Sequence, residues 1–244
     1  MLSTDDIVFL FDVDDTLLDN DRFGSDLGAE LEHAFGAGER DRYWSIYAAL
    51  RDASGYADYL GALQKFRDGI EQSKALLRMS SFLLDYPFAD RLYPSALETL
   101  NYLRTHGRIT ILSDGDIVFQ PRKIQRSGLW DAVAGEVLIT VHKEQSMVAI
   151  ERRFPACHYV MVDDKPALLA AMKRVLGQRV STVFVRQGHY ARAAIDAADS
   201  AHSAVTDPPP DFATDAIGDL RHGPFNEFLA TALNLAVVAH KEPA

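Results

Sequence analysis

The stretch FLFDVDDTLLDN, residues 9–20, places an apolar run directly before a group of acids. The three large apolar residues at 9–11 are typical of a buried strand, yet Asp12 follows at once and is joined by Asp14 and Asp15. Like charges repel at this spacing, and a carboxylate at the edge of a core is costly to desolvate. So much negative charge at the end of a strand therefore needs a compensating partner.

The composition is that of an ordinary globular protein. The chain has 244 residues, of which 48% are hydrophobic and 25% charged. This length suffices for one large domain or two unequal ones. The net charge of −10 arises from 25 basic and 35 acidic residues, without a basic stripe. Such a surface argues against nucleic acid as a partner, and any anionic substrate would need local positive groups.

Three features indicate a cytoplasmic protein without a membrane anchor. Cys157 is the single cysteine, so an internal disulfide is excluded and a reducing compartment fits. The amino terminus is acidic before a short apolar run, unlike a signal peptide. The apolar segment FLATALNLAVVAH at 228–240 is shorter than the roughly 20 residues that span a bilayer.

Five short runs rich in β-branched and large apolar residues predict buried strands. They are IVFLFD (7–12), RITILS (108–113), VLITV (137–141), HYVMVD (158–163) and VSTVFV (180–185). Helical patterns precede the last four of them: YPSALETLNYLRTHG (93–107), IVFQPRKIQRSGL (117–129), KEQSMVAIERRF (143–154) and KPALLAAMKRVLG (165–177). This alternation predicts an α/β fold, in which a parallel sheet is covered by helices on both faces.

A long gap interrupts the alternation after the first strand. More than seventy residues carry no strand pattern but four helical ones: GSDLGAELEHAFG (24–36), RDRYWSIYAALRDA (40–53), GYADYLGALQKFRDGI (55–70) and EQSKALLRMSSFLLDY (71–86). An unstructured loop of that length is implausible in a compact domain. We therefore expect a small all-helical cap at 19–91, inserted into a catalytic core made of 1–18 and 92–244.

The carboxy-terminal part of the chain predicts little regular structure before one last helix. The polar, proline-rich segment 199–215 is expected to form a surface loop, with a short strand near Phe212. A helix is expected over 224–241. Its apolar face could pack on the core or on a second subunit, so a homodimer stays open.

Polar side chains follow several of the predicted strands where each one ends. Asp12 and Asp14 follow the first, Ser113 and Asp114 the second, Lys143 the third, and Asp163 and Asp164 the fourth. Ligands bind at the carboxyl edge of a parallel sheet, so these side chains can converge on one crevice. If the backbone at 12–14 is extended, alternate side chains point the same way about 6.6 Å apart.

The acids of this crevice suit a magnesium ion. A cation could bridge Asp12 and Asp14, and Asp163 could complete its coordination. Mg²⁺ prefers oxygen ligands and often binds beside substrate phosphates. Metal binding would also cancel the repulsion among the acids.

The donors of the crevice suit a phosphoryl group. They are the Ser113 hydroxyl, the backbone N–H groups around Asp114 and Gly115, and the Lys143 ammonium. Asp12 could then be a nucleophile that forms an aspartyl-phosphate. Asp14 is placed to protonate the leaving oxygen and later to take a proton from water.

In this order, the motifs resemble those of the haloacid dehalogenase superfamily of hydrolases. DVDDT at 12–16 resembles its first motif and Ser113 its second. Lys143 resembles the third motif, and Asp163-Asp164 the fourth. The helical insertion after the first motif is similar to the superfamily's commonest cap. The resemblance implies a Rossmann-like fold, Mg²⁺ and a small phosphorylated substrate.

The resemblance also implies a role for each residue. It makes Asp12 the nucleophile and Asp14 the general acid and base, and it places Ser113, Asp114 and Lys143 around the phosphate. The metal would lie among Asp12, the backbone carbonyl of Asp14, Asp163 and Asp164. The dehalogenase branch lacks an acid two residues after the nucleophile, because its leaving group needs no proton. Asp14 therefore indicates phosphate ester chemistry.

The sequence departs from the superfamily pattern at three positions. Asp114 adds a negative charge beside the phosphate site, where the superfamily usually has asparagine or a small residue. Val162 replaces a common glycine. No acid follows at 167–168, so Asp164 must be the second acid of the fourth motif, although a helix N-cap is an equal alternative for it.

The remaining candidates are expected to be structural or solvated. We expect Lys123, a rival for the role of Lys143, at the surface, and Asp15 and Asp19 solvated or capping a helix. The histidines show no metal-ligand spacing, and the aromatics of 42–60 are expected to form the cap's own core, with one or two left open as substrate contacts. Most basic cap residues are expected to be solvated: Arg22, Arg42, Arg51, Lys65, Arg67 and Arg78.

The sequence favours an Mg²⁺-dependent phosphatase acting on a small phosphorylated metabolite, with cap closure excluding water. A phosphomutase would share this core. A receiver-like phosphorylation switch would need an acceptor Asp after its third strand, where this chain has Val141-His142. A non-catalytic metal- or phosphate-binding protein is the last alternative, and Asp114 is the feature that keeps it open.

Overall fold

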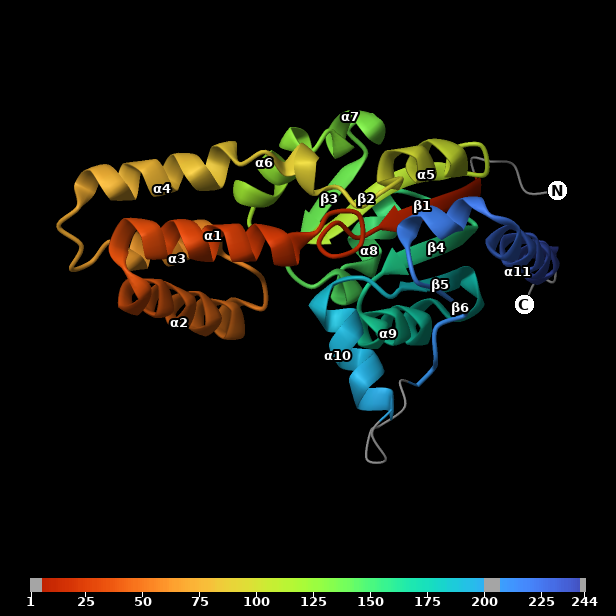
Figure 1. Ribbon diagram of the computed structural model, residues 1–244. Helices are drawn as coiled ribbons and strands as arrows, with labels where there is room; N and C mark the ends of the chain where they lie inside the picture. The colour runs from red at the N-terminus through yellow and green to blue at the C-terminus, as the bar shows by residue number, and fades with distance from the viewer. Residues whose placement is uncertain (1–5, 200–206, 242–244) are drawn as a thin grey trace.

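A six-stranded, fully parallel sheet lies at the centre of the protein (Figure 1). The computed structural model of the chain describes residues 6–199 and 207–241. The strand order is β3-β2-β1-β4-β5-β6. The strands are β1 (Ile7–Phe11), β2 (Arg108–Asp114), β3 (Val137–Thr140), β4 (His158–Asp163), β5 (Val180–Val185) and β6 (Phe212–Thr214). All five predicted strands and the short strand near Phe212 are confirmed.

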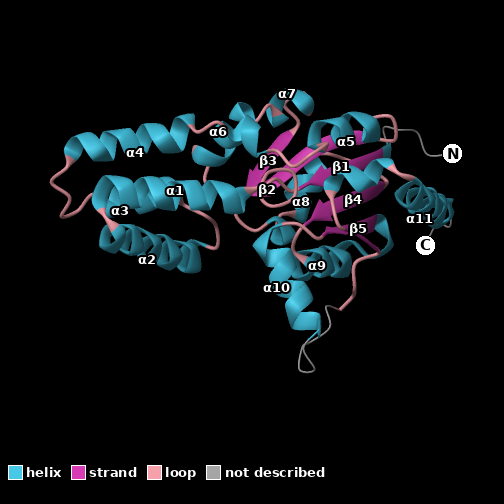
Figure 2. Cartoon of the chain, in the orientation of Figure 1, coloured by secondary structure: helices cyan, strands magenta, loops and turns pink. Residues whose placement is uncertain are grey.

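Helices cover both faces of this sheet, as Figure 2 shows. Along β1, Phe9 and Phe11 belong to one buried cluster, whereas Val8 and Leu10 belong to the other. The first cluster takes in side chains of α5 (Ala96–Leu103), α6 (Phe119–Arg126), α7 (Leu129–Ala132) and α11 (Gly223–Lys241). The second takes in side chains of α8 (Met147–Arg153), α9 (Pro166–Leu176) and α10 (Gly188–Asp199). The α/β, Rossmann-like prediction is therefore confirmed.

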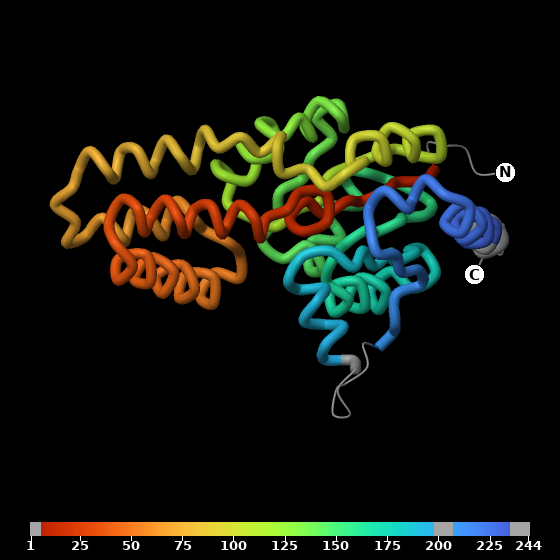
Figure 3. The backbone as a smooth tube through the Cα atoms, viewed as in Figure 1, coloured from red at the N-terminus to blue at the C-terminus, as the bar shows by residue number. Residues whose placement is uncertain are grey.

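Four helices project from one end of the sheet, and we call them the cap (Figure 3). They are α1 (Asn20–Phe35), α2 (Ala37–Ser54), α3 (Tyr59–Phe66) and α4 (Ser73–Asp85). The chain enters and leaves the cap through adjacent segments, since the Asp19 N–H donates to the Arg91 carbonyl at 2.8 Å. Just inside the core, the Tyr93 N–H donates to the Leu17 carbonyl at 3.0 Å. The division at 19 and 91 stays a prediction.

Two helices of the core have no counterpart in the sequence prediction. α7 is a single turn, and α10 follows β5 in a stretch whose sequence predicts no element. The predicted loop at 199–215 lies partly outside the described residues, because 200–206 are not described. In α11, Phe225 and Leu229 pack into the buried core. Within 6–199 and 207–241, no helix combines the length and apolarity that crossing a membrane would require.

A buried histidine in β4 makes stability depend on pH. His158 is 2% exposed, and its Nε2 lies 2.9 Å from the Ser181 hydroxyl. Burial, assisted by Lys173, lowers the pKa of His158 from 6.5 to about 4. The unfolded chain therefore binds an additional proton between these values, so stability falls as the pH drops from 6.5 to 4. The linkage amounts to about 3 kcal/mol.

Urea unfolding at pH 7, 5 and 4 measures this term against His158→Gln, which cannot titrate. We expect wild type to lose about 3 kcal/mol more stability than the variant over this range. Parallel losses in the two proteins would show that His158 is not responsible.

Candidate active site

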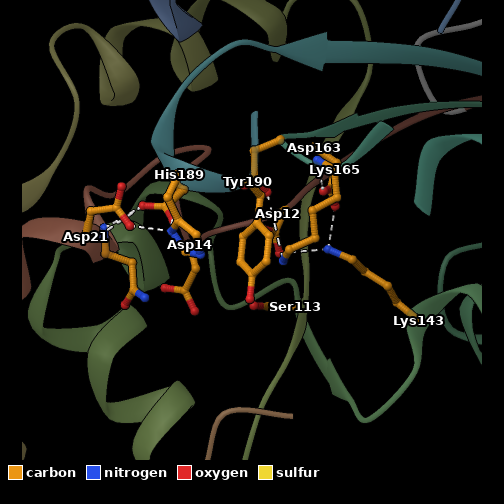
Figure 4. A network of polar contacts seen from close by, with 12 residues as sticks. Asp12, Asp14, Asp21, Ser113, Lys143, Asp163, Lys165, His189 and Tyr190 are labelled. Carbon is orange, nitrogen blue, oxygen red and sulfur yellow. Dashed lines mark hydrogen bonds and ion pairs between the residues drawn. The ribbon is translucent and has the colours of Figure 1, made fainter. Parts of the chain in front are cut away.

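Four of the predicted site residues meet at the carboxyl edge of the sheet (Figure 4). Asp12 follows β1, Ser113 lies in β2, and Asp163 ends β4. Lys143 comes from the short 3₁₀ helix η3 (Lys143–Gln145) after β3 and reaches back over the edge. Each of these four residues is at most 3% exposed.

The Lys143 ammonium joins two of these acids. Its Nζ lies 2.7 Å from Asp12 Oδ1 and 2.6 Å from Asp163 Oδ2. Burial alone would lower the pKa of Lys143, but Asp12 and Asp163 outweigh burial and raise it. Burial would likewise raise the pKa of Asp12, but Lys143, with help from Lys165, lowers it. Asp12 is thus held as a carboxylate, the form in which it could act as a nucleophile.

Asp164 lies beside this group without a hydrogen bond to either of its carboxylate oxygens from any described residue. Its nearest cation is Lys165, whose Nζ is 3.9 Å away. Burial, and then the charges of Asp163 and Asp12, raise the pKa of Asp164 to about 9, although Lys165 opposes the shift. The helix-cap alternative is wrong, because Lys165 takes the N-cap position of α9.

The three acids fit a small divalent cation. One carboxylate oxygen from each of Asp12, Asp163 and Asp164 lies within 4.8 Å of the others. Asp12 Oδ2 and both oxygens of Asp164 accept no hydrogen bond from the described residues, so they remain free as ligands. Buried carboxylate oxygens without partners are costly, and a hard cation such as Mg²⁺ would offset that cost.

Asp14 lies apart from the three acids and is held by one helix. Its Oδ1 lies 2.6 Å from the Lys123 Nζ, and its Oδ2 accepts a hydrogen bond from the Gln120 Nε2 at 3.1 Å. Both partners come from α6. The expectation that Lys123 lies at the surface is wrong, because its side chain is fully buried. The assignment of the Asp14 backbone carbonyl to the metal stays a prediction.

Gln120 links the predicted phosphate binder to the predicted acid. Its Nε2 also donates to the Ser113 Oγ at 2.9 Å, so one amide contacts both Ser113 and Asp14. Gln120 is 3% exposed. Gln120 is not among the predicted site residues. The signal for it in the sequence is its position one turn before Lys123 on α6. A Cβ at Gly115 would lie 2.8 Å from the Gln120 Cβ, so the glycine makes room for it.

Asp114 turns toward the neighbouring strand, where its Oδ1 accepts a hydrogen bond from the Thr140 hydroxyl at 2.6 Å. Burial raises the pKa of Asp114, although Lys143 and the Thr140 hydrogen bond oppose the shift. One predicted phosphate donor is corrected here. The Gly115 N–H donates to the Thr140 carbonyl at 3.0 Å and is already used in the sheet.

The two acids expected to be solvated or capping both cap. Asp19 is the N-cap of α1 and accepts from the Arg22 N–H at 2.8 Å. Asp15 accepts from the backbone N–H groups of Asn20 and Asp21, at 3.0 and 3.2 Å. Asp15 is not solvated, however. It is 1% exposed, and burial together with neighbouring Asp21 raises the pKa of Asp15 to about 6.

The start of α10 brings side chains to the site that are not among the predicted site residues. His189 Nδ1 contacts Asp21 and lies 3.3 Å from Asp15 Oδ2. The Lys165 Nζ lies 4.8 Å above the ring of Tyr190. Gly188 permits this approach, since its φ is +71° and a Cβ there would lie 2.2 Å from the Asp15 Cβ. The sequence held a signal, a glycine three residues after the end of a predicted strand.

A cavity of about 1100 Å³ lies between the cap and this edge of the sheet. Asp14, Asp114 and Lys165 line its core side. One or two aromatic residues of 42–60 are expected to contact substrate, but four of them line the cavity: Trp44, Tyr47, Tyr56 and Tyr59. Of the six basic cap residues considered, Arg51 alone lines the cavity, and its Nη1 donates to the Tyr190 hydroxyl at 3.2 Å.

Comparison with known proteins gives the class of this protein, a hydrolase, and its family. Residues 8–175 match the model of the haloacid dehalogenase-like hydrolase family, and the chain belongs to that family. A haloacid dehalogenase-like hydrolase from Burkholderia xenovorans is 53% identical in sequence. Its structure superimposes with a TM-score of 0.81 and covers 92% of this chain and 98% of its own.

More distant structures share the fold. A haloacid dehalogenase-like family hydrolase from Xanthomonas campestris has 15% identity and a TM-score of 0.64, with 93% of each chain covered. The L-2-haloacid dehalogenase from Xanthobacter autotrophicus has 20% identity and a TM-score of 0.57, covering 88% of this chain and 96% of its own. A search of curated proteins found no match.

Proposed function

We propose that this hydrolase is an Mg²⁺-dependent phosphatase, which cleaves a small phosphorylated metabolite through an aspartyl-phosphate on Asp12. The observation that carries the proposal is the position of Asp14. Its carboxylate lines the cavity two residues after Asp12 and shares the Gln120 amide with Ser113. A phosphate ester needs a proton for its leaving oxygen, whereas a departing halide does not.

The proposed reaction has two steps. In the first, an Asp12 oxygen bonds to phosphorus, the bond from phosphorus to the leaving oxygen breaks, and Asp14 gives that oxygen its proton. In the second, water attacks phosphorus and gives a proton to Asp14, the bond to Asp12 breaks, and inorganic phosphate leaves. Ser113 and Lys143 would bind the phosphoryl oxygens in both steps.

Asp12, Asp163 and Asp164 would hold the Mg²⁺, together with the backbone carbonyl of Asp14. The bound ion would supply positive charge to the phosphoryl oxygens and to the attacking carboxylate. The cavity volume and its aromatic wall support a substrate whose organic part reaches into the cap.

The test is hydrolysis of 4-nitrophenyl phosphate with Mg²⁺ and with EDTA, beside halide release from 2-chloropropionate. We expect phosphate release that requires Mg²⁺, and no halide release. Halide release that tolerates EDTA would instead identify a dehalogenase. Mg²⁺ binding with neither activity would favour a non-catalytic binding protein. Asp114 is the residue that suggests this alternative, because it adds a negative charge beside the phosphate site. Product analysis with a phosphorylated hexose separates phosphate release from transfer within the sugar, the phosphomutase reaction.

A further inference from the structure

Lys123 is an unusual lysine for its surroundings. It is 0% exposed, and four aromatic rings lie around its ammonium. The distances from Nζ to the ring centres are 5.3 Å for Phe119, 5.8 Å for Phe23, 5.8 Å for Tyr59 and 5.9 Å for Phe88. A desolvated ammonium is costly to bury, and faces of aromatic rings offset part of that cost.

The rings contact one another and form a cage where the cap meets the core. Phe23 packs on Tyr59 at 5.2 Å and on Phe88 at 5.1 Å between ring centres. Phe119 packs on Tyr59 at 5.1 Å and on Phe88 at 5.9 Å. Phe23 and Tyr59 belong to the cap, Phe119 belongs to α6 of the core, and Phe88 lies in η2 (Phe88–Arg91) at the return from the cap. Rings from both the cap and the core therefore surround the Lys123 ammonium.

The ammonium has two polar partners inside this cage. It donates to Asp14 Oδ1 at 2.6 Å and to Asn20 Oδ1 at 3.0 Å. Asn20, the first residue of α1, is tied in turn to the Tyr59 hydroxyl at 3.3 Å. Asp14 is the one carboxylate among the described residues that pairs with Lys123. A caged lysine with a single acidic partner fixes where that acid's carboxylate can lie.

We propose that Lys123 is a positioning residue for Asp14, a role that rests on the proposed phosphatase function. By holding Oδ1, Lys123 leaves Oδ2 on the side of Gln120 and Ser113, where the phosphate would bind. Oδ2 is then the oxygen that delivers the proton to the leaving group. Because the cage includes cap residues, this orientation depends on the cap being seated on the core.

The test compares Lys123→Met with wild type on two substrates of nearly equal size, 4-nitrophenyl and 4-nitrobenzyl phosphate. The benzyl alkoxide needs a proton as it leaves, and the nitrophenolate barely does. We expect kcat/KM for the benzyl ester to fall about 100-fold, the usual effect of displacing a catalytic group by about 1 Å. The loss for the phenyl ester should be at least about tenfold smaller.

Lys123→Arg keeps the donor and should recover much of the benzyl ester activity. Lys74→Met, an exposed lysine of the cap, is the matched control and should leave both rates unchanged. Methionine suits an aromatic cage, so the variant should remain folded, which circular dichroism can verify. Equal losses for both esters, or no loss for either, would overturn the positioning role.

Crystal structures give a readout that needs no turnover. In Lys123→Met the Asp14 carboxylate should leave its place beside Gln120, whereas in Lys123→Arg it should stay. An unmoved Asp14 in Lys123→Met would also overturn the proposal. If wild type hydrolyses neither ester, the phosphatase function fails, and the position of Asp14 in these crystals still decides what Lys123 does.

Discussion

Asp12→Asn is expected to lower the hydrolysis of 4-nitrophenyl phosphate by at least about 10⁴-fold. An amide cannot displace the leaving group, so no aspartyl-phosphate can form. The substitution is isosteric, and Lys143 keeps its contact with Asp163 at 2.6 Å. The fold should therefore survive the change. Acid-quenched wild-type enzyme should carry one phosphoryl group on Asp12, detectable by mass spectrometry, and the variant should carry none.

Asp68→Asn is the matched control for this substitution. Asp68 is exposed and does not line the cavity, so its variant should keep wild-type activity. Residual hydrolysis by Asp12→Asn above about a tenth of the wild-type rate would show that Asp12 is not the nucleophile. Labelling of a different residue in the quenched enzyme would lead to the same conclusion.

The sequence predicted the sheet well because its signal is local. Buried strands of a parallel sheet are short apolar runs, and the run FLF before Asp12 shows such a pattern without any knowledge of its neighbours. The polar residues at the strand ends converge for the same reason. Parallel strands end at one edge, so Asp12, Ser113 and Asp163 had to meet once the strands were placed.

The supporting residues could not be predicted in this way. Lys123 lies on a helix whose sequence is largely polar, and nothing local shows that aromatic rings of the cap enclose its ammonium. The cage forms only when segments 100 residues apart pack together. A lysine is seldom fully buried, so the expectation of an exposed side chain followed the general rule and was wrong for this reason.

α10 was missed for a different reason. Its sequence is rich in alanine, and it begins at a glycine, which is usual at a helix end rather than at a helix start. The approach of Gly188 to Asp15 explains that glycine, because a side chain would collide with the loop after β1. The same close approach carries His189 to Asp21 and Tyr190 into the cavity.

Asp14→Asn should separate the two steps of the proposed reaction. For 4-nitrobenzyl phosphate, kcat/KM is expected to fall by about 10²- to 10⁴-fold, because the alkoxide leaves without a proton. For 4-nitrophenyl phosphate, the first step should continue, since nitrophenolate is a good leaving group. The second step should then slow, because no carboxylate remains to take the proton from water.

This difference has a direct kinetic signature. Stopped-flow mixing of Asp14→Asn with 4-nitrophenyl phosphate should show a burst of about one nitrophenolate per enzyme, followed by slow turnover. The quenched variant should carry its phosphoryl group on Asp12, as the wild type does. The asparagine side chain can still accept a hydrogen bond from Lys123 through its Oδ1, so the aromatic cage around Lys123 should hold. Equal losses on both esters without a burst would mean that Asp14 supports the site but transfers no proton. The main argument for a phosphatase over a dehalogenase would then be lost.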